Sequence, residues 1–432
     1  MKFLFLLGAV FSIAACSSNV KSLRGATLLR EPSKGNETNF YNDGYKQFKA
    51  KLKTFSNKFS DKFISQKFVD GENITVSPLS LEMCLGLAIC ASNGTTRQEM
   101  LDALGMDYNT FKAHYSTLYN EYNRSKDSNG GDLMFEIMMT NSIWIDDNIE
   151  LKDSGLDDLK DNYYCYSYET DFSGKKANEA IAKFIEIQSK GLLKPTLNID
   201  PRTLFVLMNT LYLKDIWNET GNNLNFSDNP EHYFVNSDKS KSSKKLLDGY
   251  YFAGKAISNE NYSAFHTSTE NGFKIYFVKP NDGKEIRNVF TREAMDYVLN
   301  SENYVYQDDI KKEEYETQCF FPEFKADCDA NLESILINDF NIKSLFDSEN
   351  CDFSNLTDEG VFCNEVKQIA KLDVNKKGIE GAAVTYMAAC GNAGPGEYTT
   401  VYEDFVVNKE FGFILTYSDS VVFSGVITNI DK

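Results

Sequence analysis

The feature that most constrains the fold is Thr203–Leu213, which reads Thr-Leu-Phe-Val-Leu-Met-Asn-Thr-Leu-Tyr-Leu and is almost continuously apolar. Such a run predicts a central β-strand that is buried on both faces. A strand of this kind needs a large sheet around it and covering layers above and below. Asn209 is the one side-chain amide in the run. In a buried strand it must find hydrogen-bond partners, or it costs roughly 1 to 3 kcal/mol.

The rest of the chain predicts a mixture of helices and strands. Helical periodicity marks Tyr45–Val69 and Asn178–Leu193, a helix after Pro78 should run to about Ser92, and Thr96 with Glu99 forms a capping-box pattern before a further short helix. Strand patterns occur at Asn73–Pro78, Phe135–Ile145, Phe273–Val278, Thr317–Phe324, Phe411–Tyr417 and Val421–Ile427. Asp419 and Ser420 suit a hairpin turn between the last two strands.

A second informative stretch is Val374–Val384, which is rich in small and β-capable side chains. Thr385–Tyr402 follows it and contains Gly391, Gly394, Pro395 and Gly396. Glycine and proline at this density predict an exposed connection without a stable element of its own. Small side chains before such a loop would let it slide between two paired strands without a clash.

Composition describes a globular chain of 432 residues, of which 42% are hydrophobic and 25% charged. The net charge of −18 argues against nucleic acid and anionic surfaces as partners. The densest basic run, Lys239–Lys245, is interpreted as a solvated loop. The three histidines, His114, His232 and His266, stand beside no catalytic serine or cysteine pattern. We therefore expect neither an enzyme, nor a metal site, nor a cofactor.

The N-terminus predicts export. The apolar run Phe3–Ala15 after Lys2 is too short for a membrane span and is typical of a signal peptide. Ile13-Ala14-Ala15-Cys16 is similar to a bacterial lipobox, so residues 1–15 would be removed and Cys16 would carry lipid. Residues 16–43 are polar and predict a flexible tether to a single domain over 44–432. The alternative is a secreted protein, which several Asn-x-Ser/Thr sequons, including Asn73, Asn93 and Asn261, would also suit.

The cysteine pattern does not decide whether the protein contains disulfides. Nine occur, and the eight besides Cys16 permit disulfides in an exported protein, but no spacing defines their connectivity. Cys84 and Cys90 lie in an apolar run and are interpreted as buried small hydrophobic residues.

Five separated blocks of the sequence resemble the serpin family, in the family's own order. They are Asn73–Ser80, Asn93–Leu101, Thr203–Trp217, Phe321–Lys325, and the terminal pair Phe411–Leu415 with Phe423–Val426. The resemblance runs from about Tyr45 to Lys432. It implies an α+β serpin fold, with a large, mostly antiparallel central sheet, two smaller sheets, about eight to nine helices and an exposed reactive-centre loop.

The resemblance also implies a function. A serpin of the inhibitory type is cut in its reactive-centre loop by a serine or cysteine endopeptidase, and the cut loop then inserts as a new strand and traps the enzyme. Strand addition and the release of stored strain are the physical basis of this mechanism. We expect a monomer whose partner is such a peptidase. The alternative is a non-inhibitory binding or storage protein on the same fold.

The resemblance places the reactive-centre loop at about residues 376–402. Its hinge would be Gly378, Ile379, Glu380, Gly381, Ala382, Ala383 and Val384. Counting from the hinge with the family's spacing puts the cleaved bond at Asn392-Ala393; the alternatives are Ala388, Ala389 and Thr399. Lys376, Ile379 and Gly381 depart from the usual hinge residues, although none of them is a proline that would stop a strand from pairing.

The resemblance further implies two polar or aromatic clusters under the central sheet. The "shutter" would contain Ser77, Pro78, Ser80, Asn209 and Gln368, with Gln368 where many serpins have a histidine. Trp217 would mark the "breach", the point at which the loop enters the sheet. The polar shutter residues could fasten the strands reversibly, or they could simply satisfy buried backbone groups.

Overall fold

The computed structural model describes residues 20–35, 40, 42–127, 133–217, 223–363, 365–380 and 398–431. The chain forms two compact units, each assembled from three separate stretches. The first unit comprises Met1–Phe48, Ser80–Leu213 and Asn331–Val366, and the second comprises Lys49–Leu79, Lys214–Ala330 and Lys367–Lys432. Helix α2, helix α3 and strand β6 each continue from one unit into the other.

The described helices are close to the segments that periodicity predicts. They are α2 (Asp43–Lys67), α3 (Pro78–Ala91), α4 (Gly94–Leu104), α5 (Tyr108–Glu121), α6 (Asp153–Asn162), α7 (Lys175–Gln188), α8 (Ile286–Val289), α9 (Arg292–Val298) and α10 (Glu333–Phe340). Pro78 is the first residue of α3, where the missing N–H of proline costs no helical hydrogen bond. No helix in the described part of the chain is both long and apolar enough to cross a membrane.

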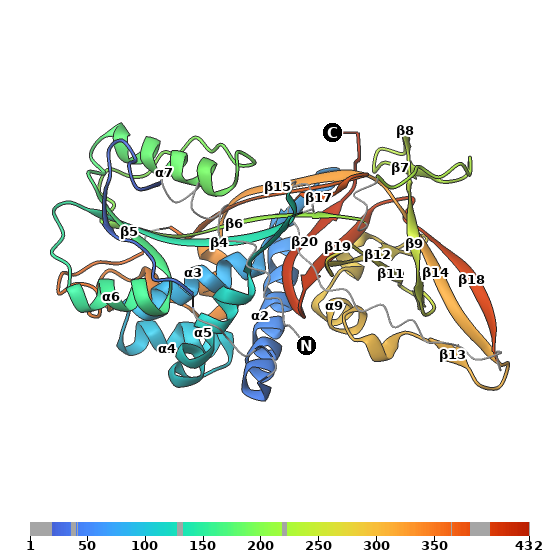
Figure 1. The fold of residues 1–432 in the computed structure, drawn as a ribbon, viewed down its shortest axis with the longest axis horizontal. Helices are drawn as coiled ribbons and strands as arrows, with labels where there is room; N and C mark the ends of the chain where they lie inside the picture. Colours follow the sequence, from blue (N-terminus) through green and yellow to red (C-terminus); the bar gives the residue numbers. More distant parts are fainter. Residues whose placement is uncertain are drawn as a thin grey trace, which may run out of the picture. The chain divides into compact units, whose positions relative to one another are not determined.

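The first unit is built on a sheet that helices cover on both faces. Its strands are β1 (Thr27–Arg30), β3 (Asn123–Asp127), β4 (Leu133–Asp146), β5 (Cys165–Thr170) and most of β6 (Phe205–Ile216). The order is β1-β5-β4-β6, with β3 paired to β4; β4 and β5 are parallel, and β1 is antiparallel to β5. Figure 1 shows α7 on one face of these strands and α3 to α6 on the other.

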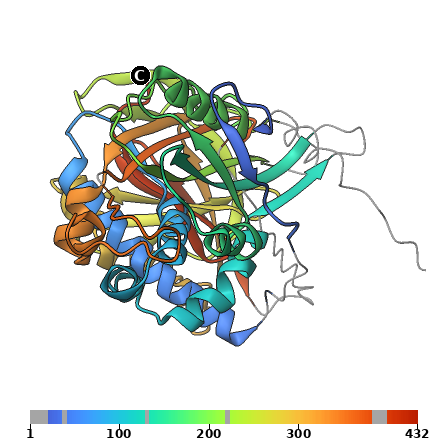
Figure 2. The same ribbon diagram turned by 90° about the vertical axis from the view of Figure 1, so that its left-hand side faces the viewer.

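Residues 20–30 correct the expected tether over 16–43. Val20 and Leu23 are buried in one hydrophobic cluster with Trp144, Tyr168 and Phe184, and β1 extends the sheet at its β5 edge. The Tyr168 hydroxyl donates to the Val20 carbonyl at 3.0 Å. Figures 1 and 2 show this dark-blue N-terminal arm, residues 20–30, beside β5 and α7. Val20 and Leu23, with Ala26 and Leu28 packed against the same cluster, and one strand edge hold this part of the segment in place.

The second unit contains four further groups of strands. A six-stranded sheet has the order β10 (Ile257–Ser258), β11 (Tyr262–Ser268), β12 (Lys274–Pro280), β19 (Phe411–Tyr417), β20 (Ser420–Ile427) and β2 (Ile74–Val76). A four-stranded sheet contains β9 (Leu247–Ala253), β13 (Gln307–Asp308), β14 (Glu313–Phe321) and β18 (Thr399–Val406), and β7 (Tyr233–Val235) pairs with β8 (Lys241–Lys245). The last group continues the central sheet from the end of β6, in the order β6-β17-β16-β15. Its strands are β15 (Phe324–Asn331), β16 (Lys367–Asn375) and β17 (Gly378–Glu380).

The core of the second unit lies at β19 and β20, whose residues are all buried. Their turn is Ser418-Asp419, and both residues have positive φ, 46° and 68°. This backbone is typical of a two-residue hairpin turn, one position earlier than the sequence predicts. Helix α2 packs its apolar stripe into this core, and the Ser60 hydroxyl lies 2.7 Å from that of Ser424 on β20.

Two sequence predictions about local structure are wrong. Thr96 and Glu99 do not cap α4, because the helix already begins at Gly94. Glu99 Oε2 instead accepts hydrogen bonds from the backbone of Lys343 and Ser344, each at 2.7 Å, since tertiary contacts override the local pattern. Strand β6 is also less buried than expected: Phe205–Asn209 are only half-buried, and buried positions begin at Thr210.

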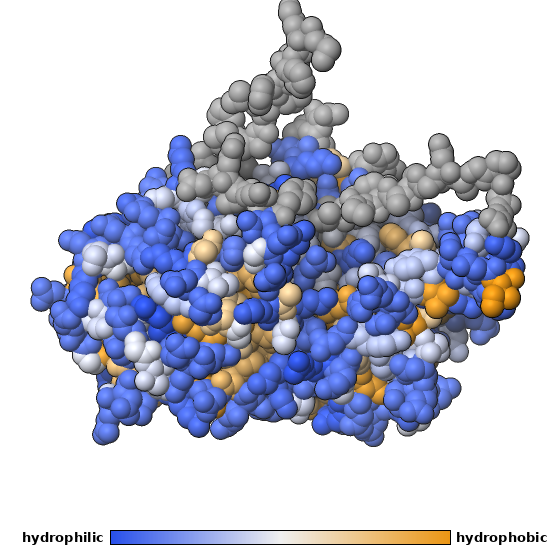
Figure 3. Space-filling view, turned by 90° about the horizontal axis from the view of Figure 1, so that it is seen from below, coloured by the Kyte–Doolittle hydropathy of each residue, from blue (hydrophilic) through white to orange (hydrophobic). Residues whose placement is uncertain are grey.

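The surface is mainly hydrophilic. The face in Figure 3 shows hydrophobic residues in small scattered groups among charged ones. The exposed large hydrophobic residues of the described chain are Val69, Tyr250, Tyr251, Tyr297, Val305, Tyr306, Ile310, Phe362 and Tyr402. Among them, the Tyr251 and Tyr402 rings contact each other at a centroid distance of 5.2 Å. Exposed apolar residues in such small groups are normal on globular domains.

Candidate functional site

The first three residues of the predicted hinge, Gly378–Glu380, form strand β17. Strands β16 and β17 are an antiparallel hairpin in which Asn375 pairs with Gly378 and Asp373 pairs with Glu380. Lys376 and Lys377 form the two-residue turn, and Asn375 Oδ1 accepts a hydrogen bond from the Lys377 amide at 2.9 Å. Lys376, a departure from the usual hinge sequence, is therefore a turn residue and is not buried in a sheet.

Strand β17 is paired on both of its edges. Besides β16, it pairs with the last residues of β6, with Gly378 opposite Ile216 and Ile379 opposite Asp215. The Ile379 side chain is 1% exposed. A β-branched apolar side chain suits such a position, so this second departure from the usual hinge fits the local structure.

Gly378 is required by the close approach of β17 to β6. A Cβ atom at this position would lie 1.8 Å from the Asp215 carbonyl oxygen and 3.0 Å from Ile216 Cα. Both contacts are with backbone, which cannot rotate away as a side chain can. A glycine is therefore needed for the hinge to pair here.

Trp217 lies directly beside this hairpin. Its Nε1 donates a hydrogen bond of 2.7 Å to the Asn375 carbonyl, and its ring packs against Phe321 at a centroid distance of 5.3 Å. The side chain is 2% exposed. The structure thus places Trp217 beside the β16–β17 hairpin, and its role as a breach residue stays a prediction.

Asp215 is a buried carboxylate beside the hinge that sequence reasoning missed. It accepts hydrogen bonds from Asn271 Nδ2 at 2.8 Å, from the Asn271 amide at 3.2 Å and from the Ile216 amide at 2.8 Å. Burial raises the pKa of Asp215 to about 6, although hydrogen bonds from Thr269 and Asn271 oppose the shift. The sequence feature that could have identified Asp215 is a charged residue at the end of a mostly apolar strand.

Ser77 and Gln368 form one polar pair in the second unit, which we call the Gln368 pair. The Ser77 amide donates to Gln368 Oε1, and Gln368 Nε2 donates to the Ser77 carbonyl, both at 2.8 Å. The Ser77 hydroxyl donates to the Val422 carbonyl at 2.7 Å. Gln368 therefore satisfies both backbone groups of a buried residue, as the two sides of its amide allow.

Asn209 belongs to a different polar group, in the first unit, which we call the Asn209 group. Its Nδ2 donates to Asn141 Oδ1 at 2.9 Å, and Asn141 Nδ2 donates to the Tyr115 hydroxyl at 3.0 Å and to the Tyr163 carbonyl at 2.8 Å. The Ser80 hydroxyl reaches the Asn209 carbonyl only at 3.5 Å, the limit for a hydrogen bond. The predicted shutter residues thus fall into two groups that belong to different units.

Most of the predicted reactive-centre loop lies outside the described residues. Its undescribed residues include the hinge residues Gly381, Ala382, Ala383 and Val384, the bond Asn392-Ala393 and the alternatives Ala388 and Ala389. The predicted lipidation residue, Cys16, also lies outside the described residues. Thr399 is described: it is the first residue of β18, opposite Glu313, and its amide donates to the Lys312 carbonyl at 2.8 Å. A bond held in a paired strand is a poor site for peptidase cleavage, which disfavours this alternative.

Comparison with known proteins decides the family. The family model for Serpin (serine protease inhibitor) matches residues 50–430. The chain belongs to the serpin family. Serine protease inhibitor 88Ea of Drosophila melanogaster is 24% identical over 371 residues, covering 82% of this chain and 84% of that protein.

Solved serpin structures show the same fold. The thermophilic serpin tengpin in its native state matches with a TM-score of 0.69 at 17% identity, over 94% of this chain and all of that one. Thyroxine-binding globulin in complex with thyroxine matches with a TM-score of 0.68 at 18% identity, over 89% of this chain and 99% of that one. The predicted serpin fold class is confirmed. Serpins are in general peptidase inhibitors rather than enzymes, and some members do not inhibit.

Proposed function

We propose that this serpin is a suicide inhibitor of serine or cysteine endopeptidases. Cleavage of the loop after the hinge would release it, and the cut segment would extend β17 as a new strand of the central sheet. Each added main-chain hydrogen bond contributes roughly 1 kcal/mol. A dozen residues would supply a large driving force, so the uncut fold would be kinetically trapped.

One observation supports the proposal: Gly378–Glu380, the first three residues of the predicted hinge, are already paired where insertion would begin. Gly378–Glu380 lies between β6 and β16, with backbone partners on both edges. The main cost of starting a new strand is the ordering of its first residues. In this serpin that cost has already been met at Gly378, beside Trp217.

The test is incubation of the purified serpin with a panel of serine and cysteine peptidases. We expect at least one peptidase to form a covalent adduct that survives denaturation and gel electrophoresis. The matched variant Ala383→Pro should be cut without forming the adduct, because proline cannot donate to the sheet on insertion. Cleavage of the wild type without any adduct, and without a rise in its melting temperature, would favour the non-inhibitory alternative.

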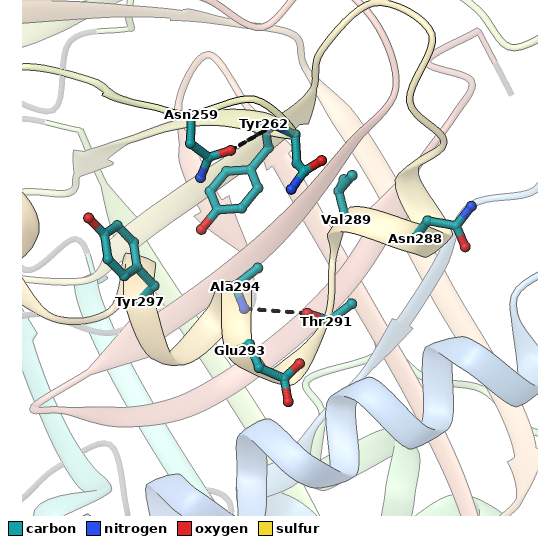
Figure 4. Close-up of a pocket in the computed structure, with 9 residues that line it drawn as sticks. Asn259, Tyr262, Asn288, Val289, Thr291, Glu293, Ala294 and Tyr297 are labelled. Atoms are coloured by element: carbon teal, nitrogen blue, oxygen red, sulfur yellow. Dashed lines mark hydrogen bonds between the residues drawn. The ribbon is translucent and has the colours of Figure 1, made fainter.

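A second candidate function is the binding of a small molecule, and one pocket favours it. A cavity of about 260 Å³ lies between β11 and the helices α8 and α9, and Tyr262, Thr291, Glu293 and Tyr297 are among its lining residues. Figure 4 shows Tyr262 pointing from β11 toward α9. Two tyrosines and several polar side chains line the cavity, which suits a small ligand that has both an aromatic ring and hydrogen-bonding groups. The thyroxine-binding relative shows that this fold can carry an aromatic ligand.

This candidate is tested separately from inhibition. Thyroxine and other aromatic acids and phenols would be titrated against the serpin while tyrosine fluorescence is recorded. If the pocket binds them, Tyr297→Ala should weaken binding at least tenfold, whereas Tyr250→Ala, a change at an exposed tyrosine outside the pocket lining, should not. Absence of saturable binding up to millimolar ligand would remove the candidate and leave inhibition untouched.

We also propose export and lipid attachment at Cys16. The sequon residues Asn73 and Asn93 support the lipoprotein over a glycosylated secreted chain, because their side-chain amides are used inside the fold. Asn73 Nδ2 donates to the Lys325 and Asn429 carbonyls at 3.0 and 2.6 Å, and Asn93 Nδ2 donates to Asn355 Oδ1 at 2.7 Å. Labelling of the wild type, but not of Cys16→Ser, by a radioactive fatty acid in a bacterial host would support the anchor; no labelling would count against it.

A further inference from the structure

Three described cysteines are partly exposed, and two of them come together in the first unit. Cys84, Cys351 and Cys363 are half-buried, whereas Cys90, Cys165, Cys319 and Cys328 are buried. Cys351 and Cys363 lie on the segment between α10 and β16. All seven are free thiols in the structure.

Cys351 and Cys363 converge on one backbone group, the carbonyl oxygen of Leu345. The Cys351 thiol lies 3.4 Å from this oxygen, and the Cys363 amide donates to it at 2.9 Å. The Cys351 sulfur and the Cys363 amide nitrogen therefore lie at most about 6 Å apart, a separation compatible with a disulfide between the two residues. The Cys363 thiol itself lies 3.3 Å from the Glu365 carbonyl oxygen, so its Sγ must leave that contact to reach Cys351.

The segment that carries Cys351 is fixed in place by α4. Glu99 Oε2 accepts from the Ser344 amide and hydroxyl, both at 2.7 Å, and Thr96 Oγ1 accepts from the Asp352 amide at 3.0 Å. The Cys351 amide itself donates to the Asp347 carbonyl at 2.9 Å. Hydrogen bonds before and after Cys351 in the chain therefore hold this cysteine in position in the folded structure.

We propose that Cys351 and Cys363 form a disulfide when the folded serpin meets a small disulfide oxidant such as glutathione disulfide. One thiolate attacks the oxidant, which forms a mixed disulfide and releases one glutathione thiolate. The second thiolate then attacks the protein sulfur of that mixed disulfide and releases the second glutathione. In balance, two protein thiols lose two protons and two electrons, one Sγ–Sγ bond forms, and glutathione disulfide is reduced to two glutathione molecules.

The surroundings set the rate and the consequence of this step. Burial raises the pKa of Cys351 to about 11 and that of Cys363 to about 12, so the reactive thiolates are scarce at neutral pH. Oxidation should be slow at pH 7 and faster at pH 9. The bond would close a short loop immediately before β16, the strand that pairs with the hinge. Closing a loop limits the unfolded chain more than the folded one.

The experiment uses the full chain, purified with reductant and then freed of it. The native protein is incubated with glutathione disulfide at pH 9, remaining thiols are alkylated in denaturant, and unreduced peptides are analysed by mass spectrometry. We expect one linked pair, Cys351 with Cys363, and alkylation of the four buried cysteines. Single variants Cys351→Ser and Cys363→Ser should each retain glutathione on the remaining thiol of the pair. Cys84→Ser is the matched control and should leave the linked pair unchanged.

Several outcomes would overturn the proposal. One is complete alkylation of Cys351 and Cys363 in the wild type, and another is stable glutathione on both. A link between Cys84 and Cys363 would also overturn it, and this pairing is the sharpest competitor because Cys84 also acts on the pKa of Cys363. A linked pair found only when oxidation is carried out in denaturant would show that the fold does not bring the thiols together. A higher melting temperature after oxidation, absent in Cys351→Ser, would support the bond independently.

Discussion

The Gln368 pair and the Asn209 group differ in how completely their hydrogen bonds are satisfied. In the second unit, Gln368 bonds both the amide and the carbonyl of Ser77. In the first unit, Asn209 Oδ1, Thr210 Oγ1 and the Tyr163 hydroxyl are buried without a hydrogen-bond partner among the described residues. Unsatisfied buried polar groups are uncommon and cost free energy. The Asn209 group is therefore the less stable arrangement, and a change of partners there would cost less than at Gln368.

The largest test of this difference is Gln368→Ala. The change would remove the side-chain amide that bonds both the backbone amide and the backbone carbonyl of buried Ser77. At 1 to 3 kcal/mol for each buried group that loses its bond to Gln368, we expect a loss of about 4 kcal/mol of unfolding free energy. Urea denaturation of the uncut protein would measure it. Gln98→Ala, at an exposed glutamine of α4, is the control and should change stability little; equal effects of the two variants would contradict the comparison.

The second test is the pH dependence that Asp215 produces beside the hinge. Burial raises the pKa of Asp215 in the folded state from 3.8 to about 6. The folded state thus binds this proton more tightly than the unfolded state, so its contribution to stability is complete below pH 3.8 and is lost as the pH rises through about 6. The full effect is about 3 kcal/mol. Denaturation between pH 4 and 7 would measure it, and Asp215→Asn should flatten the profile. A variant profile with the wild-type slope would assign the effect to other groups.

The third test concerns the hinge itself. Gly378→Ala would place a Cβ atom 1.8 Å from the Asp215 carbonyl oxygen, so β17 should leave the sheet. We expect hydrogen exchange at the amides of Ile379 and Glu380 to accelerate about thirtyfold, which corresponds to about 2 kcal/mol of local opening free energy. Gly360→Ala, where an added Cβ would meet nothing within 4 Å, is the matched control. Unchanged protection in Gly378→Ala would show that the hinge is not held by this pairing.

The smallest effect is expected at Asn209. Asn209→Ala removes one hydrogen bond to Asn141, but it also removes a buried oxygen that has no described partner. These terms oppose each other, and we expect a loss of about 1 kcal/mol. Asn141→Ala, which removes two donated bonds to Tyr115 and Tyr163, should cost more. If Asn209→Ala proved as costly as Gln368→Ala, the difference between the two polar groups would disappear.

Much of the fold could be predicted because its strongest signals are local. The apolar stripe of α2 repeats at helical spacing, and the turn between β19 and β20 joins two continuously apolar runs. Thr96 and Glu99 mislead because a capping box and a pair of tertiary hydrogen-bond acceptors look identical in sequence. The N-terminal arm was missed because Val20 and Leu23 are too few to show a period, and only the surface of β5 and α7 makes them core residues.

The site could be predicted only in part, because its contacts join residues that are far apart in the sequence. The serpin resemblance predicts that Gly378 is a hinge residue, but the sequence could not show that β6 backbone leaves no room for a Cβ atom there. Gln368 was expected to donate and accept, and the structure identifies Ser77 as its partner. Asp215 was missed because its role depends on Thr269 and Asn271, more than fifty residues away along the chain.

The buried start of the N-terminal arm limits how far an anchored molecule could stand from its membrane. Val20 is 0% exposed, and only Ser17, Ser18 and Asn19 separate it from Cys16. Four residue steps span at most about 14 Å. If Cys16 carries a fatty-acyl chain, as we propose, β5 and α7 would lie close to the lipid headgroups. The orientation of the molecule relative to the membrane would then be restricted, and so would the directions from which a peptidase could approach.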